Sequence, residues 1–193
     1  MTKKIILDLC GGTGSWSRPY KNAGYDVRNI TLPDFDVRTY QPPENVYGIL
    51  AAPPCTMFSL ARTKANKPRD LKEGMECVRA CLNIIWACRE QHKLAFWALE
   101  NPMGYLRQFL GNPIYTFDPS QFHEDYNKTT DVWGYFKPPK RGKKARYFTT
   151  DDNTRQLPDI PADYKKDETM SNLQIRRSIT PKGFAEAFFR ANQ

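Results

Sequence analysis

The chain has 193 residues and carries 29 Lys and Arg against 21 Asp and Glu, a formal net charge of +8. Its content of 40% hydrophobic and 13% aromatic residues excludes a disordered chain, and no apolar run approaches the roughly 18 residues of a membrane span. The N-terminus has no secretory signal, so we expect one cytoplasmic domain over residues 1–193. The positive charge favours an anionic partner.

Strands and helices are predicted to alternate along the first half of the chain. Apolar runs that end at glycine, proline or polar residues predict strands at 4–9, 47–52 and 93–99, and residues 25–32 are predicted to form a strand that ends at Pro33. Residues 15–23 are compatible with a helix, and apolar residues at spacings of three and four predict another at 70–91. This order is typical of βαβ units, so we expect an α/β fold with a mostly parallel central sheet and flanking helices.

The second half of the chain is less regular. Residues 130–136 suit a late strand, and residues 181–192 suit a terminal helix. Between them, residues 137–146 hold six basic residues and no acid, within a stretch, 135–171, that we interpret as a short basic insertion. Cys77, Cys81 and Cys88 share one face of the helix at 70–91, which predicts core cysteines, and no spacing of cysteines or histidines indicates a metal site.

Three glycines follow the first predicted strand, in the sequence DLCGGTG at residues 8–14. Glycines at a strand-to-helix turn let a ligand approach the backbone, and the following helix N-terminus favours anionic groups, so a nucleotide-like cofactor is indicated. Ser17 stands where a dinucleotide-binding turn has its third glycine, which disfavours nicotinamide and flavin cofactors. A tight connection without a ligand is the alternative interpretation.

A cysteine and a glutamate follow the third and fourth predicted strands. Pro53 and Pro54 restrict the backbone before Cys55, which suits a positioned nucleophile, although a half-buried loop thiol is the simpler interpretation. Glu100 ends a very apolar run, where burial would raise the pKa of its carboxyl toward that of a general acid. A turn or helix-cap carboxylate is the alternative there.

Taken together and in this order, the glycine turn, the Pro-Pro-Cys motif and the Glu-Asn motif resemble the cytosine-C5 DNA methyltransferases, which use S-adenosylmethionine. The resemblance is strong over residues 4–102 and weak over 126–135 and 174–192. It implies a Rossmann-like S-adenosylmethionine-dependent methyltransferase fold. It also implies that Cys55 attacks C6 of cytosine and that Glu100 contacts N3.

The resemblance further implies a set of cofactor-binding residues in the glycine turn, beyond the second strand and before the cysteine. These are Asp8, Leu9, Cys10, Gly11, Gly12, Thr13, Gly14, Trp16, Asp34, Asp36, Val37 and Pro53. Within this set, Asp36 matches the acid that contacts the adenine amino group, and Asp34 is the candidate for the ribose hydroxyls. Cys10 departs from the family, which has an aromatic residue there, and Trp16 suits a pocket lining or core packing equally well.

Residues expected to contact the substrate flank the cysteine and occupy the basic stretches. They are Pro54, Ser59, Asn101, Lys128, Lys140, Arg141, Lys143, Lys144 and Arg146. Lys128 is the candidate for the family's basic eighth motif, and residues 177–181 resemble its ninth. Basic residues with aromatic rings beside them, at 135–136 and 147–148, favour phosphate contacts and stacking.

The resemblance therefore implies a compact DNA (cytosine-5-)-methyltransferase, similar to those of phages, prophages and restriction-modification systems. The stretch 135–171 is too short for the family's target-recognition domain, so we expect little sequence specificity, on duplex DNA with the cytosine flipped out, or recognition supplied by a partner subunit or self-association. The alternatives are methylation of cytosine in RNA or in a free nucleotide, and an inactive DNA-binding protein on the same scaffold.

Overall fold

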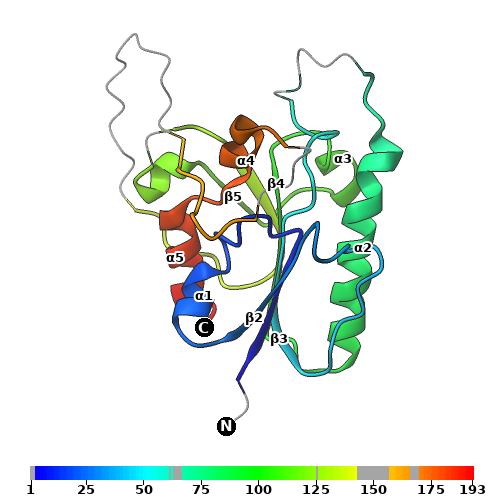
Figure 1. The fold of residues 1–193 in the computed structure, drawn as a ribbon, viewed down its shortest axis with the longest axis vertical. Coiled ribbons are helices and arrows are strands. Elements are labelled where there is room, and N and C mark those ends of the chain that lie inside the picture. The colour runs from blue at the N-terminus through cyan, green and yellow to red at the C-terminus, as the bar shows by residue number, and fades with distance from the viewer. Residues whose placement is uncertain (1–2, 61, 63–66, 125, 143–156, 166–169) are drawn as a thin grey trace.

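A computed structural model describes residues 3–60, 62, 67–124, 126–142, 157–165 and 170–193. One six-stranded sheet forms its centre, in the order β2-β1-β3-β4-β6-β5 (Figure 1). The strands are β1 (Ile5–Leu9), β2 (Asp26–Ile30), β3 (Val46–Ala51), β4 (Phe96–Pro102), β5 (Tyr115–Phe117) and β6 (Thr130–Tyr135). The first four are parallel, and β6 is antiparallel to both β4 and β5. The expected α/β fold with a mostly parallel sheet is confirmed.

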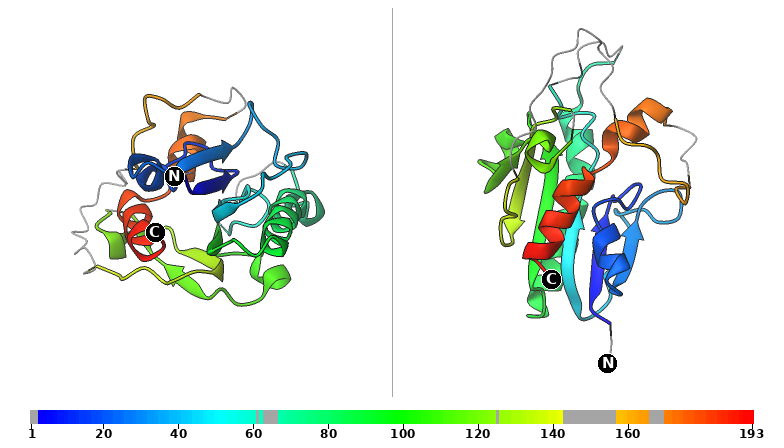
Figure 2. Two further views of the ribbon diagram at one scale, coloured as in Figure 1. Left: turned by 90° about the horizontal axis from the view of Figure 1, so that it is seen from below. Right: turned by 90° about the vertical axis from the view of Figure 1, so that its left-hand side faces the viewer.

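Helices cover both faces of the sheet (Figures 1 and 2). They are α1 (Arg18–Asn22), α2 (Leu71–Glu90), α3 (Arg107–Leu110), the short 3₁₀-helix η1 (Pro119–Phe122), α4 (Asn172–Ser178) and α5 (Lys182–Ala191). The long helix α2 lies against one face, and α1 and α5 lie together against the other. Among the described residues, no helix has the length and apolar character needed to cross a bilayer.

The strands alternate between two apolar clusters, because successive side chains of a strand point to opposite faces. In β1, Leu7 and Leu9 pack toward α2, whereas Ile6 packs toward α1 and α5. Ile49 and Leu50 of β3 divide in the same way. A strand that is buried on both faces reads as a continuous apolar run, which explains why the sequence predicts these strands well.

Core cysteines and element boundaries agree with the sequence in part. Cys81 and Cys88 are buried in the cluster under α2 as predicted, while Cys77 is half-buried at its edge. The first helix is shorter than expected, because the turn after β1 extends as far as Ser17. Residues 137–142 of the basic insertion run beside β5, where the Tyr115 hydroxyl donates to the Pro139 carbonyl.

The order of the strands places a crevice at one edge of the sheet. The chain moves from β1 to β2 on one side and then to β3 on the other side of β1, so the connections after β1 and β3 diverge. Ligands bind at such a switch point, outside the carboxyl ends of the parallel strands. The start of β1 and the end of α5 lie toward the opposite edge (Figure 1).

Candidate active site

The glycine turn after β1 is fixed by the backbone and by a residue of β2. Cys10, Gly12 and Gly14 have φ of 55°, 50° and 67°, and the Gly14 amide donates to the Gly11 carbonyl at 2.8 Å. The Asn29 side chain donates to the Gly12 carbonyl at 3.0 Å. A Cβ atom on Gly12 would meet nothing within 4 Å, so this glycine borders open space. The backbone of the turn is therefore accessible to a ligand.

Gly11 has a different role, because it packs directly on Asp8. A Cβ atom on Gly11 would lie 2.4 Å from both the Asp8 carboxyl carbon and Asn29 Oδ1. Asp8 is fully buried, and its Oδ2 accepts a hydrogen bond from Ser17 Oγ at 2.5 Å. Its Oδ1 has no partner in the described part of the chain, and burial raises the pKa of Asp8 to about 7. Asp8 supports the turn from beneath.

Ser17 and Asn29 are site residues that the sequence did not reveal. Ser17 looked like a missing third glycine, yet its hydroxyl is the group that binds Asp8. Asn29 pairs with Asp8 in the β1–β2 register and was hidden within a run interpreted only as a strand. A polar residue inside a half-buried strand was the available signal.

The loop that carries Cys55 follows β3 and is fastened at both ends. Asn101 Nδ2 donates to the Pro53 carbonyl at 2.9 Å, which ties this loop to β4. The amides of Phe58 and Ser59 both donate to the Cys55 carbonyl at 2.9 Å, and the Phe58 ring is fully buried. Cys55 thus occupies a tight turn at the carboxyl edge of the sheet, with its side chain half-buried.

Glu100 lies in β4, the strand beside β3. Its Oε2 is buried and has no hydrogen-bond partner among the described residues. Burial raises the pKa of Glu100, and the nearby Lys128 ammonium lowers it in part. Burial likewise raises the pKa of Cys55, which Lys128 lowers and Glu100 raises. Cys55, Glu100 and Lys128 therefore lie within electrostatic reach of one another.

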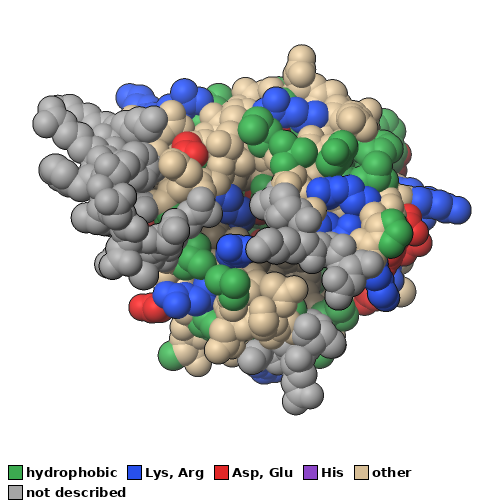
Figure 3. Space-filling view, turned by 90° about the horizontal axis from the view of Figure 1, so that it is seen from above, with side chains coloured by type: hydrophobic (Ala, Val, Ile, Leu, Met, Phe, Trp, Pro, Cys, Tyr) green, Lys and Arg blue, Asp and Glu red, His purple; other side chains and the backbone are tan. Residues whose placement is uncertain are grey.

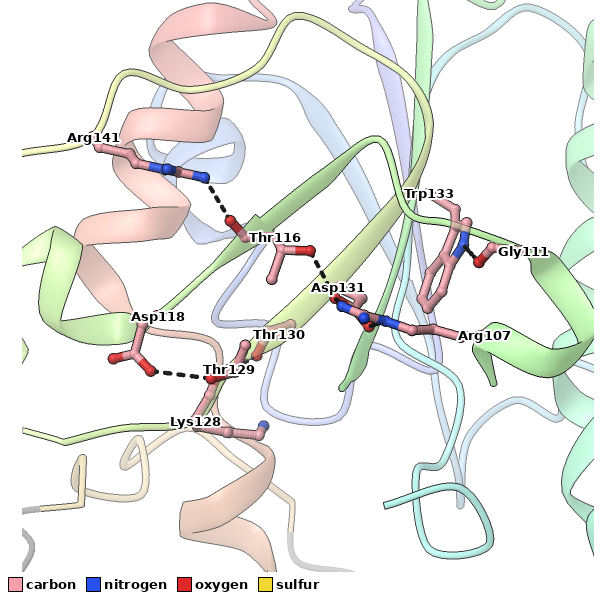
Figure 4. Close-up of polar contacts among 10 residues, drawn as sticks. All are labelled: Arg107, Gly111, Thr116, Asp118, Lys128, Thr129, Thr130, Asp131, Trp133 and Arg141. Carbon is pink, nitrogen blue, oxygen red and sulfur yellow. Dashed lines mark hydrogen bonds and ion pairs between the residues drawn. The ribbon is translucent and has the colours of Figure 1, made fainter. Parts of the chain in front are cut away.

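Lys128 links two segments that are distant in sequence. It lies just before β6, close to Thr129 and Thr130 (Figure 4), and its Nζ donates to the Arg177 carbonyl of α4 at 2.9 Å. The Met103 amide, next to the end of β4, donates to the Thr129 carbonyl at 2.9 Å. The structure thus brings the segments around 128 and 177, where the family resemblance is weak, to the same edge as Cys55.

The two acidic residues expected at the cofactor site, Asp34 and Asp36, both form ion pairs within the protein. Asp34 is exposed and lies 3.1 Å from Lys165. Asp36 accepts hydrogen bonds from Arg38, which lower the pKa of Asp36 to about 2. Val37 is buried beside them. Asp34 borders a cavity of about 240 Å³ next to the glycine turn, with Gly12, Thr13, Gly14 and Asn29.

A second, wider groove of about 460 Å³ lies between residues 37–42 and α2, and Val37 lines it. Neither cavity is lined by Cys55 or Glu100. Cys10 packs toward the cluster under α2 that contains Cys81. These placements put the glycine turn, Asp34 and Val37 along the side of the crevice that is formed by β1, β2 and α2.

Two expected ligand-contacting positions belong to the core instead. Trp16 is 2% exposed and packs on Phe184 and Phe188, with ring centroids 5.9 and 5.3 Å apart, so it cannot contact a ligand in this conformation. Leu9 is fully buried in β1, so only its backbone is available. Of the two choices that the sequence left open for Trp16, the structure supports packing.

Of the basic residues expected to bind nucleic acid, Lys128, Lys140 and Arg141 are described, and their surroundings differ. Arg141 donates to the Thr116 carbonyl at 2.7 Å and lies over the Tyr115 ring, so its guanidinium is engaged within the protein. Lys140 is exposed. Tyr135 ends β6 opposite Trp97 near the start of β4, at the edge away from Cys55, and Phe136 packs on Phe188. Lys143, Lys144, Arg146, Tyr147 and Phe148 lie outside the described residues.

Seen from above, the face at the carboxyl edge is hollowed and has Lys and Arg side chains at its centre, with hydrophobic side chains around them (Figure 3). Pro54 is exposed on the Cys55 loop, and Ser59 forms a bridge with Gly104. Within the described part of the chain, no group of three or more His, Cys, Asp or Glu is arranged to bind a metal ion.

The sequence was compared with protein-family models and with curated proteins. No family model matches the chain, and no curated protein matches it.

Proposed function

We propose that the protein is an S-adenosylmethionine-dependent methyltransferase that acts on C5 of cytosine in DNA through a covalent bond from Cys55 to C6. One observation carries the proposal. The glycine turn, the Cys55 loop and Glu100 follow or lie in three neighbouring parallel strands and meet at the switch point of the sheet, with Lys128 beside them. This is where open α/β sheets bind their ligands.

The glycine turn fits the cofactor at one end. Gly12 borders open space, and the adjoining cavity is lined by Thr13, Gly14 and Asn29. We assign the amino-acid half of S-adenosylmethionine to this turn, and the adenosine half to the side of the crevice with Asp34, Asp36 and Val37. When bound, the cofactor supplies an electrophilic methyl group. Binding of its ribose to Asp34 requires the exposed Asp34–Lys165 pair to open, which costs little because exposed pairs contribute about 0–1 kcal/mol.

Cys55 and Glu100 divide the activation of the cytosine ring between them. The C5 carbon becomes nucleophilic when a thiolate adds to C6, because the C5–C6 π electrons then move to C5 and, through C4, to N3. We assign to Glu100, whose pKa is raised by burial, the proton placed at N3 that neutralises the charge developing there. After methylation, a base removes the C5 proton and Cys55 leaves C6, which restores the ring.

The raised pKa of Cys55 means that its thiol is protonated in the free protein at neutral pH. Lys128 is the cation that lowers this pKa, so it favours the thiolate when substrate is present. The Lys and Arg side chains at the carboxyl edge favour binding of the negatively charged phosphates of DNA. Because phosphate contacts carry no sequence information, we propose that the enzyme has only a weak preference for the DNA sequence around its target cytosine.

The test is transfer of labelled methyl groups from S-adenosylmethionine to duplex DNA, RNA and dCMP in parallel. Labelled DNA supports the proposal, and labelled RNA or dCMP alone would reassign the substrate. Cys55→Ala should abolish transfer, whereas Cys88→Ala, the same change at a buried core cysteine, should retain it.

A trapping experiment isolates the covalent step. A cytosine with fluorine at C5 has no proton to lose after methylation, so Cys55 cannot leave C6 and the protein should stay bonded to the DNA under denaturing conditions. This complex should require both Cys55 and S-adenosylmethionine. If no substrate is labelled and the cofactor does not bind, the enzyme proposal fails in favour of a DNA-binding protein.

A further inference from the structure

Arg69 contacts the Cys55 loop but belongs to none of the glycine-turn, Pro-Pro-Cys and Glu-Asn motifs. It lies just before α2, and its guanidinium donates to three backbone carbonyls of the loop: Met57 at 3.0 Å, Ser59 at 2.8 Å and Arg62 at 3.4 Å. The guanidinium also lies over the Tyr105 ring, with its central carbon 4.9 Å from the ring centroid. A single half-buried side chain therefore satisfies much of the loop's backbone.

Two glycines hold the same loop from its other sides. A Cβ atom on Gly104 would lie 2.2 Å from the Phe58 carbonyl oxygen, and one on Gly74 would lie 2.8 Å from Met57 Cβ. The Phe58 carbonyl accepts a hydrogen bond from the Tyr105 amide at 3.0 Å. The turn after β4 and the first turn of α2 thus pack closely against the loop, and Arg69 adds hydrogen bonds to its carbonyls.

We propose that Arg69 is a positioning residue that fixes the Cys55 loop, and with it the distance and direction of the thiol relative to Glu100. A guanidinium suits this role because its planar fork offers five donors and stacks on an aromatic ring, whereas an ammonium is a single point donor. Without Arg69, the carbonyls of Met57 and Ser59 lose the donors that the structure gives them. The loop then gains freedom at the residues that follow Cys55.

The consequence for the reaction rests on the proposed function, but the positioning itself does not. Burial raises the pKa of Cys55, so a loosened loop that admits water should lower that pKa and expose the thiol. Alkylation of Cys55 then becomes faster. Methyl transfer should become slower, since a displacement of about 1 Å at a reacting group can cost on the order of 10²-fold in rate.

The experiment compares Arg69→Lys with Arg89→Lys, the same change near the far end of α2, in the full chain. Alkylation of Cys55 by iodoacetamide is followed against pH by peptide mass spectrometry, which separates Cys55 from the other four cysteines. Arg69→Lys should react several-fold faster and with a lower pH midpoint, and Arg89→Lys should react like the wild type. An unchanged rate and midpoint in a folded Arg69→Lys would overturn the proposal.

Two further measurements distinguish a failure of the Arg69 proposal from a failure of the proposed function. In methyl transfer, Arg69→Lys should lower kcat and leave KM for S-adenosylmethionine unchanged, because the glycine turn is untouched. If the wild type transfers no methyl group, the proposed function fails while the alkylation result still decides the role of Arg69. Should Arg69→Lys not fold, Tyr105→Leu removes only the ring beneath the guanidinium and should shift alkylation in the same direction by a smaller factor.

Discussion

Asp8 and Asp131 are both fully buried aspartates of the same sheet, but their surroundings differ. The Asp131 carboxylate accepts two hydrogen bonds from Arg107, each at 2.6 Å, and one from Thr116 at 2.8 Å (Figure 4). Asp8 accepts one from Ser17, and its Oδ1 has no partner among the described residues. Both carboxylate oxygens of Asp131, at the antiparallel end of the sheet, therefore have hydrogen-bond partners. Only one of the two oxygens of Asp8, at the parallel end, has a partner in the described structure.

The same contrast extends to the neighbours of each aspartate. At the antiparallel end, Trp133 Nε1 donates to the Gly111 carbonyl and Thr130 Oγ1 donates to the Lys128 carbonyl (Figure 4). At the parallel end, Asn29, Glu100 and Asn101 each keep a buried oxygen with no partner in the described structure. Leaving such an atom unpaired costs about 1–3 kcal/mol, and Ser120 Oγ and Trp97 Nε1 elsewhere in the described structure are unpaired too. For the three at the parallel end, the proposed function supplies an explanation, because a ligand at this edge could pair with them. Under the proposed function, the parallel edge serves the reaction and the antiparallel end serves stability.

The strongest test of this division is Glu100→Gln. The amide keeps the shape of the side chain but cannot place a proton at N3, so kcat for methyl transfer should fall by about 10²–10⁴-fold. The free energy of unfolding should not fall, because the Oε2 that is replaced has no partner in the described structure. Single-turnover transfer and urea unfolding measure the two quantities. Glu44→Gln, an exposed glutamate, is the control, and a Glu100→Gln protein that is active or strongly destabilised would contradict the division.

Asp8→Asn tests the Asp8 carboxyl through the pH dependence of stability. The pKa of Asp8 is about 7 in the folded protein and 3.8 in its ordinary state, so unfolding releases the Asp8 proton between these values. Wild-type stability should therefore decline as pH rises from about 4 to about 7, by at most about 4 kcal/mol from this group, and then level off.

The Asp8→Asn protein has no titrating group at this position. Its free energy of unfolding relative to the wild type should therefore rise over the same pH interval and stay constant above it. Urea unfolding at several pH values between about 4 and about 8 measures this difference. Asp131→Asn is the matched variant, and it should lower stability at neutral pH because it disrupts the bonds from Arg107. A pH-independent difference for Asp8→Asn would show that Asp8 is not titrating in this range.

Arg107→Met tests the Asp131 carboxyl. It leaves the buried Asp131 charge with Thr116 as its remaining partner, so the free energy of unfolding should fall by about 3 kcal/mol, the lower end for a broken buried pair, since Arg107 itself is half-exposed. Activity per folded molecule should be retained at low temperature. The double variant Arg107→Met/Asp131→Asn should recover part of the loss. If the free energy of unfolding falls equally in the single and double variants, the unpaired charge of Asp131 is not the cause of the loss.

The sequence revealed the parallel half of the molecule because its information is local there. The strands β1, β3 and β4 are mostly buried apolar runs, and Cys55 and Glu100 follow such a run or lie near its end, so their shared edge could be predicted. The antiparallel end depends on side-chain pairings between different elements. Arg107 and Asp131 are 24 residues apart, and no periodicity indicates their pairing.

The same reasoning explains what was misplaced near the site. Tyr135 appeared to flank the basic stretch, but the antiparallel direction of β6 carries it to the opposite edge from Cys55. Trp16 follows the glycine turn in sequence, yet the docking of α5 encloses it in the core. In both cases a contact with a distant element decides the position of the side chain, and neighbouring residues carry no trace of it.

The smallest expected effect comes from Lys128→Gln. The ammonium lowers the pKa of both Glu100 and Cys55, so its removal should raise both, and the pH midpoint of Cys55 alkylation should move upward by about one pH unit or less. Lys128→Arg keeps the charge and should leave the midpoint in place, as should Lys140→Gln beside β5. The direction is opposite to that expected for Arg69→Lys, which separates an electrostatic effect on Cys55 from a loosened loop. An unmoved midpoint in Lys128→Gln would reduce the role of Lys128 to its hydrogen bond with the Arg177 carbonyl.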